Sequence, residues 1–176
     1  MVEMKRYVIT DDAAGRSLVS SESLTNSQSQ EGFFWRSTLW ATERFPPDNA
    51  VDKDISAANI QREPGVAGIL FRALEIAPDD PDPQRHRDVM ATLHKEVEQQ
   101  HEPTEQDLNR HPGMHKTGTL DFITCIFGEI QLMTDTDEVT MRAGDTAIMR
   151  GGNHAWSNRT SQPCLLTVVL VHASAG

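Results

Sequence analysis

The stretch His115-Lys116-Thr117-Gly118-Thr119-Leu120-Asp121 decides the fold expected for this chain. Every second side chain of a β-strand points to the same face of the sheet. One such face here would carry only polar side chains, those of His115, Thr117, Thr119 and Asp121. This pattern is unusual for a hydrophobic core and natural for the inside of a barrel that holds a polar ligand or a metal. A solvent-exposed strand face is the alternative.

A second stretch further along the chain has a similar pattern. His154, Trp156 and Asn158 alternate in the same way. Gly151 and Gly152 precede them and allow a tight turn that would aim His154 inward. A second strand therefore offers another histidine on a partly polar face.

Together the two stretches supply a set of metal ligands. Two neutral imidazoles and one carboxylate, from His115, His154 and Asp121, bind a divalent metal and leave coordination positions open for a substrate. Iron, manganese, zinc, nickel and copper all suit these ligands, and the spacing does not choose among them. The cofactor expected is thus a divalent metal ion of open identity.

Most of the remaining chain consists of short β-type runs between turn residues. We expect strands over 5–10, 17–24, 33–42, 66–76, 122–133 with a bend near Gly128, 138–142, 146–149, 156–158 and 165–171. Residues 25–30, rich in Asn, Ser and Gln, are expected to form a loop. Strands at short spacing with glycine-containing turns predict a β-sandwich or barrel.

Residues 79–110 break this β pattern. Apolar residues fall at helical spacing between Pro83 and Pro103, and we expect one helix of about four turns over 84–100. This segment leads directly into His111 and His115. We expect it to cover a barrel end or a neighbouring subunit, and its placement suggests a lid.

The two polar stretches resemble the two sequence motifs of the cupin superfamily. The first motif reads HxHxxxE and then Gly, and the second has a Gly-Asp turn, a Gly, a His and an Asn. The matching residues here are His115 to Asp121 with Gly128, and Gly144-Asp145, Gly151, His154 and Asn158. Thr117 replaces the second histidine, Asp121 replaces the glutamate, and the proline usual in the second motif is missing.

The resemblance is to small single-domain cupins with HxTxTxD and RGxxHAWxN motifs. It covers residues 113–171 well and extends thinly over 5–78, where Leu39-Trp40-Ala41-Thr42 and Phe71-Arg72 match. It implies an all-β cupin barrel, a double-stranded β-helix or jelly roll, with extra N-terminal strands and one inserted helix.

The resemblance also implies one domain over 1–176 and a homodimer. Within that domain we expect an N-terminal strand extension over about 1–78, a helical insertion over about 79–110 and the cupin motifs over about 111–172. The aromatic stretch 33–40 is expected to contribute to the dimer.

Other residues are candidates for roles around the pocket. His111 would supply a further ligand or a catalytic general base, with a solvated loop histidine as the alternative. Arg72 would bind a substrate carboxylate, pair with Asp121 or face solvent. The expected substrate-binding residues are Thr117, Thr119, Trp156 and Asn158.

These residues predict a metal-dependent enzyme that acts on a small oxygenated organic substrate, a carboxylate among the candidates. A Lewis-acidic metal would support decarboxylation, isomerisation or dehydration, and iron with oxygen would support dioxygenation. A non-catalytic protein that binds a small molecule in a metal-free pocket is the alternative. A structural or storage barrel is a third reading, which the single domain and the polar face argue against.

Composition excludes some partners and predicts a compartment. The 26 acidic residues outnumber the 16 basic ones, and the formal charge of −10 disfavours nucleic acid. No apolar run approaches the roughly 18 residues of a membrane span. The N-terminus has no apolar signal segment, so we expect a cytoplasmic protein. Cys125 and Cys164 are expected to be buried free thiols.

Overall fold

The computed structural model describes residues 4–24, 26–50, 53–57, 62–96 and 101–174. Its strands are β1 (Lys5–Asp11), β2 (Ser17–Leu24), β3 (Asn26–Gln30), β4 (Phe34–Thr42), β5 (Ile69–Ile76), β6 (Thr119–Phe127), β7 (Glu129–Thr134), β8 (Glu138–Arg142), β9 (Thr146–Arg150), β10 (His154–Ser157) and β11 (Cys164–His172). Its helices are α1 (Pro83–Glu96) and α2 (Glu105–Arg110). Within these ranges neither helix is long and apolar enough to cross a membrane.

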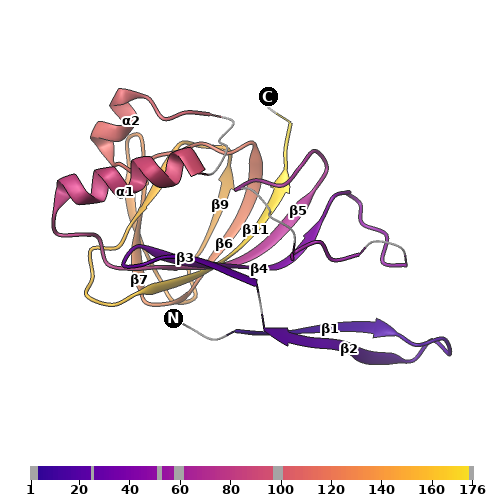
Figure 1. The fold of residues 1–176 in the computed structure, drawn as a ribbon. Coiled ribbons are helices and arrows are strands. Elements are labelled where there is room, and N and C mark those ends of the chain that lie inside the picture. The colour runs from indigo at the N-terminus through magenta and orange to yellow at the C-terminus, as the bar shows by residue number, and fades with distance from the viewer. Residues whose placement is uncertain (1–3, 25, 51–52, 58–61, 97–100, 175–176) are drawn as a thin grey trace.

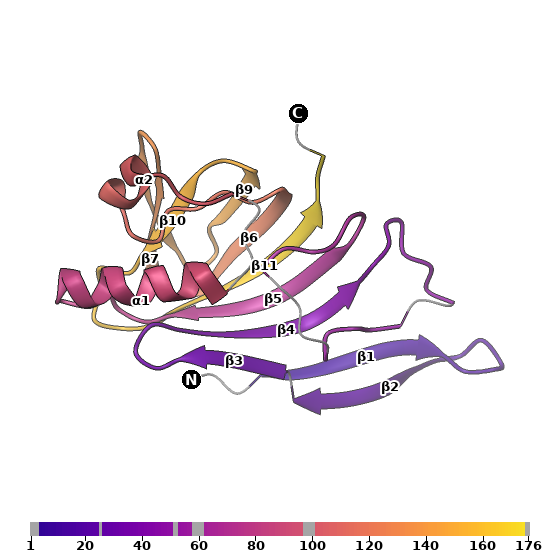
Figure 2. The ribbon, with the colours of Figure 1, turned by 45° about the horizontal axis from the view of Figure 1, so that its top comes forward.

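Two antiparallel sheets make up the barrel (Figures 1 and 2). The larger has the strand order β3-β4-β5-β11-β6-β9, and the smaller has the order β10-β7-β8. From β6 to β11 the chain passes repeatedly between the two sheets, as in a jelly roll. The all-β jelly-roll architecture predicted from the sequence is therefore confirmed. Strands β1 and β2 form a separate hairpin beside the barrel.

Alternation along the strands places the core between the sheets. On β6, Asp121, Ile123 and Cys125 are buried, whereas Phe122 and Ile126 are exposed. The main core cluster draws on five strands and contains Ile123, Cys125, Ile130, Leu132, Met141, Met149, Cys164 and Leu166. Both cysteines are buried and free, as predicted, with their Sγ atoms 3.7 Å apart.

Phe71 and its neighbours across the larger sheet form an exposed apolar row on the outer face. Strand register aligns Trp40, Phe71, Val169, Phe122 and Ile148 across five adjacent strands, and we call this set the outer row. Three of its members are clearly exposed: Phe71 (37%), Phe122 (43%) and Ile148 (56%).

The N-terminal half differs from the prediction in two respects. Residues 26–30, expected to form a loop, form strand β3 instead, because their backbone pairs with β4 around the turn at Gly32, where φ is +77°. Main-chain pairing thus outweighs the weak β propensity of Asn, Ser and Gln. Strands β4 and β5, assigned to an N-terminal extension, are inner strands of the larger sheet.

The insertion contains two helices rather than the single helix expected. Helix α1 matches the predicted one up to Glu96, and residues 97–100 of that prediction lie outside the described ranges. Helix α2 starts at a capping box: Thr104 Oγ1 accepts from Asp107 N (3.2 Å), and the Asp107 carboxylate accepts from Thr104 N (2.8 Å). The Thr-x-x-Asp spacing is the sequence signal that was missed.

Gly128→Ala is expected to lower the free energy of unfolding by about 2–3 kcal/mol. Gly128 joins β6 to β7 at a φ of +83°, and an added Cβ would lie 2.8 Å from the Pro163 oxygen. Urea unfolding measures the loss. Gly144→Ala is the matched control, because its φ is +97° and nothing lies within 4 Å of its added Cβ. If both variants lose the same free energy of unfolding, the contact between the added Cβ and the Pro163 oxygen has no effect.

Candidate active site

His115 and His154 meet between the two sheets. His154 begins β10, and a pair of backbone hydrogen bonds joins it to His115 (2.9 and 3.0 Å) in an isolated β-bridge. The centres of the two imidazole rings are 4.2 Å apart. The first motif is therefore not one continuous strand as expected: β6 begins at Thr119, and His115 lies outside it on this bridge.

Backbone carbonyl groups fix the orientation of both imidazoles. Nδ1 of His115 lies 2.9 Å from the Gly113 oxygen, and Nδ1 of His154 lies 2.9 Å from the Gly152 oxygen. A carbonyl only accepts, so each Nδ1 carries the proton and each Nε2 carries a lone pair. Metal-binding histidines in proteins are oriented in this way.

Asp121 reaches the same space from the larger sheet. Its side chain is 3% exposed, and Oδ1 is buried without a hydrogen-bond partner among the described residues. Oδ2 accepts a long hydrogen bond of 3.5 Å from Thr117 Oγ1. Burial, helped by the charge of Glu63, raises the pKa of Asp121 to about 6. A cation would satisfy the unpartnered oxygen and lower this pKa.

These three residues lie in a jelly roll of two antiparallel sheets, where His115 and His154 are joined by a β-bridge. The fold is a cupin barrel. The predicted fold class and the resemblance on which it rested are thus confirmed at the level of the fold.

Three curated fungal proteins are similar to a short segment of this chain, and no family model matches it. Phomopsin biosynthesis cluster proteins C' and D of Diaporthe leptostromiformis are each 42% identical over 48 residues, covering 27% of this chain and 25% of theirs. Oryzines biosynthesis cluster protein J of Aspergillus oryzae is 43% identical over 53 residues, covering 27% and 30%. The match thus spans less than a third of each relative.

Several solved structures are similar in fold at low sequence identity. An RmlC-like cupin from Shewanella frigidimarina has a TM-score of 0.44 and 10% identity over 85% of both chains. A putative ethanolamine utilization protein Q from Salmonella typhimurium has a TM-score of 0.44 and 8% identity over 99% of this chain and 100% of its own. These likenesses concern the fold and not the activity.

The cupin barrel encloses a cavity of about 210 Å³. His115, His154, Thr117 and Asp121 line it, and Trp156 forms part of its wall beside His154. The apolar remainder of the wall includes Leu74, Ile76, Ile123, Leu166, Val168 and Leu170. The structure thus brings the predicted metal ligands, together with Thr117 and Trp156, to one cavity.

Three arginines also line this cavity: Arg36, Arg62 and Arg72. Arg72, on β5, is 5% exposed and so does not face solvent; its guanidinium donates to the Arg62 oxygen (2.7 Å) and to Thr38 Oγ1 (3.3 Å). Burial, together with the charge of Arg36, lowers the pKa of Arg72 to about 9 and that of Arg62 to about 10. Arg62 and Arg72 therefore remain cationic at neutral pH, and the charges of Arg36, Arg62 and Arg72 are close enough to repel one another.

Helix α1 closes one side of the cavity. Met90, Leu93 and His94 share a helix face at i, i+3 and i+4 spacing, and all three line the cavity. His94 Nε2 contacts the Pro112 oxygen (2.9 Å), and its ring centre lies 6.4 Å from that of His115. The helix was predicted from the sequence, whereas His94 was not assigned to the site, although its spacing from Met90 and Leu93 places it on the same helix face.

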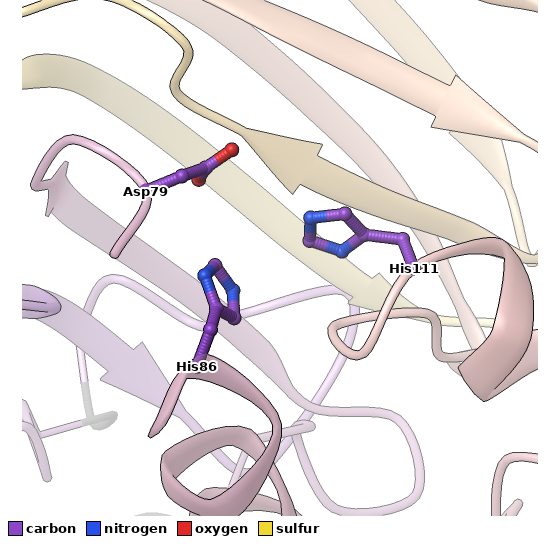
Figure 3. A group of neighbouring side chains, drawn as sticks. All are labelled: Asp79, His86 and His111. Atoms are coloured by element: carbon purple, nitrogen blue, oxygen red, sulfur yellow. The ribbon is translucent and has the colours of Figure 1, made fainter. Parts of the chain in front are cut away.

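His111 does not line the cavity, so the structure does not place it as a general base there. It lies instead in a cluster with Asp79 and His86 (Figure 3). Among the described residues, only these three His, Cys, Asp or Glu side chains offer ligand atoms that all lie within 4.8 Å of one another. The ligand atoms of His115, His154 and Asp121 therefore do not all lie within 4.8 Å of one another.

Two other predicted substrate contacts, Asn158 and Thr119, do not line the cavity. The Asn158 side chain is fully buried and bonded within its own turn and to the end of β5: Nδ2 donates to the Gln162 and Ile76 oxygens, and Oδ1 accepts from Thr160 N. Thr119 is 1% exposed and does not line the cavity. The structure therefore does not bring Asn158 and Thr119 to the cavity with the other predicted substrate contacts.

Acid is expected to destabilise the metal-free protein through His154. Burial lowers the pKa of this imidazole to about 4, against 6.5 for the free group. The folded state then binds fewer protons than the unfolded state between pH 6.5 and 4, and the free energy of unfolding falls as the pH drops through that window. His154→Gln is expected to reduce this loss by on the order of 3 kcal/mol, measured by urea unfolding in EDTA.

Asp121 provides the control, because its pKa shift has the opposite sign. Its raised pKa stabilises the folded state as the pH falls from about 6 towards 3.8, so Asp121→Asn should steepen the acid loss. The same pH dependence in wild type and His154→Gln would show that His154 is not the group responsible.

Proposed function

We propose that the barrel is a metal-dependent enzyme that acts on a small anionic substrate carrying at least one carboxylate. The observation that carries this proposal is that three arginines and two histidines with Nε2 lone pairs line one cavity. Guanidinium groups match the planar geometry of carboxylates. The neutral imidazoles and the unpartnered Asp121 oxygen suit a divalent cation.

Each part of the cavity then has a role. His115 and His154 would hold the metal, and Asp121 would become the third ligand after its side chain moves closer, since the three ligand atoms do not all lie within 4.8 Å of one another. When bound, the metal would supply Lewis acidity at a carbonyl or carboxylate oxygen, which suits decarboxylation, isomerisation or dehydration. Arg36, Arg62 and Arg72 would bind and orient the anionic groups of the substrate.

The remaining wall would control protons and water. His94 lies on the helix side of the cavity with its ring centre 6.4 Å from that of His115, so we assign it the proton transfer. Trp156, Leu166 and Val168 provide an apolar surface that limits water around the reacting groups.

A metal-by-substrate screen tests the proposal. Protein stripped with EDTA is loaded with zinc, manganese, iron, nickel or copper and mixed with 2-oxo, 2-hydroxy and dicarboxylic acids in deuterated water. Proton NMR then reports loss of a carboxylate, loss of water or exchange of the α-hydrogen. We expect turnover that depends on the metal and is lost in Arg72→Met. Anion binding without turnover by any loaded form would favour the non-catalytic alternative.

We further propose that the protein is a homodimer joined through the outer row. Burying these apolar side chains against a second copy would remove them from water. Phe122→Lys is expected to convert the dimer to a folded monomer, measured by light scattering after gel filtration. Val139→Lys, at an exposed apolar position on β8 (53% exposed), is the matched control. A wild-type monomer would contradict the proposal. A cytoplasmic location stays a prediction.

A further inference from the structure

We propose that Asp79, His86 and His111 form a second divalent-metal site, of the zinc type, which holds helix α1 against the wall of the barrel. This site lies outside the cavity and does not depend on metal binding by His115 and His154. Its ligands are two imidazoles and one carboxylate, the donor set of open zinc sites, with a fourth position left for water.

The three side chains converge from separate segments in and directly after the insertion. Asp79 follows β5, His86 lies in the first turn of α1, and His111 directly follows α2. Figure 3 shows the three side chains pointing toward a common space. Their ligand atoms lie within 4.8 Å of one another, and ligand pairs around tetrahedral zinc are about 3.4 Å apart. Side-chain movements of about 1.5 Å or less therefore close the site.

His86 provides the observation that points to a ligand. Its side chain is 8% exposed, and Nε2 is buried with no hydrogen-bond partner in the part of the chain that the structure describes. Its ring packs edge-on against Phe33 (5.9 Å) on one side and His111 (5.5 Å) on the other. A buried nitrogen without a partner is costly unless something binds it, and a metal ion is the partner that Asp79 and His111 complete.

The other two ligands are already oriented by their neighbours. Both Asp79 oxygens accept a hydrogen bond, one from the Asn158 backbone N (2.9 Å) and one from Ser157 Oγ (2.5 Å). Such outer contacts hold a ligating carboxylate in place. Burial lowers the pKa of His111 to about 4, so this ring is neutral at pH 7 and available to bind.

Metal binding requires one rearrangement at His111. Gly113 N donates to His111 Nδ1 (3.0 Å), so in the metal-free protein the ring proton is on Nε2. Coordination through Nε2 moves that proton to Nδ1 and breaks this hydrogen bond. One neutral hydrogen bond is a small loss beside the binding free energy of a zinc ion.

The neighbours of the site give it a structural consequence. Gly113, bonded to His111, lines the cavity, and Asp79 binds the end of β10 directly after Trp156, which also lines it. Helix α1 carries His86 at its start and presents Met90 and Leu93 to the cavity. An ion at the site would therefore tie the helix to two parts of the cavity wall and hold it closed.

Cobalt titration of a variant without the pocket histidines tests the proposal. In His115→Gln/His154→Gln protein, stripped with EDTA, the cluster is the predicted site that remains. We expect one Co²⁺ per chain with visible absorption of four-coordinate cobalt, displaced by Zn²⁺. Adding His86→Gln or His111→Gln is expected to weaken Co²⁺ binding at least 100-fold, whereas His101→Gln, an exposed histidine, leaves it unchanged.

Limited proteolysis gives a readout independent of metal counting. In the His115→Gln/His154→Gln protein, here called the pocket variant, Zn²⁺ is expected to slow cleavage within 83–110. The same protein with His86→Gln added should show no such protection. Circular dichroism checks that each variant folds; if His86→Gln does not, His111→Gln carries the comparison. The proposal would be overturned if the folded pocket variant binds no Co²⁺. It would also be overturned if neither His86→Gln nor His111→Gln changes Co²⁺ binding. Failure of the pocket metal alone would leave this site intact.

Discussion

Replacing His115 and His154 together by glutamine is expected to lower the affinity of the pocket for a divalent metal at least 100-fold and to abolish turnover. Both imidazoles line the same cavity, and glutamine keeps a similar volume without an imidazole nitrogen. Two of three ligands would be lost, and a single carboxylate does not hold a transition metal against water. Metal content by mass spectrometry and Zn²⁺ titration calorimetry measure the effect.

Controls separate this pocket from the rest of the chain. Asp121→Asn is expected to lower the affinity for the metal less than the double variant does, because asparagine retains an oxygen donor. His101→Gln, at an exposed histidine, should bind metal as wild type does. If the double variant keeps a full complement of metal that His86→Gln removes, then the ion belongs to the Asp79, His86 and His111 cluster alone, and the pocket is metal-free.

Arg72→Met is expected to weaken the binding of small dianions such as malonate on the order of 100-fold, since hydrogen bonds to charged groups contribute about 1.5–3 kcal/mol. Methionine keeps an unbranched chain of similar reach and removes a cation that Arg36 and Arg62 repel. The free energy of unfolding without ligand is therefore expected to stay within about 1 kcal/mol of wild type or to rise.

Thermal shift measures both effects in one experiment. At 100 times the dissociation constant, malonate should stabilise wild-type protein by about 2.7 kcal/mol, which raises Tm by about 5–11 °C. The Arg72→Met shift at that concentration should be close to zero. Arg16→Met, on the β1–β2 hairpin, is the control. If malonate raises the Tm of Arg72→Met as much as that of wild type, Arg72 does not bind the anion, and the arginines no longer support an anionic substrate.

Local patterns predicted the barrel well because its strands alternate cleanly and its turns contain glycine. The two motif histidines could be assigned because each follows a recognisable turn or strand pattern. Arg36 and Arg62 could not be assigned in this way. Arg36 lies in an aromatic stretch that predicts core packing, and Arg62 lies in an irregular segment, so only the folded chain shows that both reach the cavity.

Long-range contacts explain the other differences. The cluster of Asp79, His86 and His111 spans 33 positions of sequence and depends on how α1 and α2 pack, which no local spacing encodes. Asn158 matched a family motif, yet its amide is bonded within its own turn and to the end of β5. A motif position thus predicted that the residue matters to the fold without distinguishing a binding role from a structural one.

The alternation of β5 has an evolutionary consequence. Arg72 faces the cavity and the adjacent Phe71 faces outward, and the same division continues across β11 and β6. Single substitutions at inward positions can therefore change which small molecule is accepted while the outward surface is inherited unaltered. With the proposed pocket and the proposed dimer, selection on ligand preference and selection on assembly would act on separate residues of the same strands, so descendants of this sequence could diversify in one property while conserving the other.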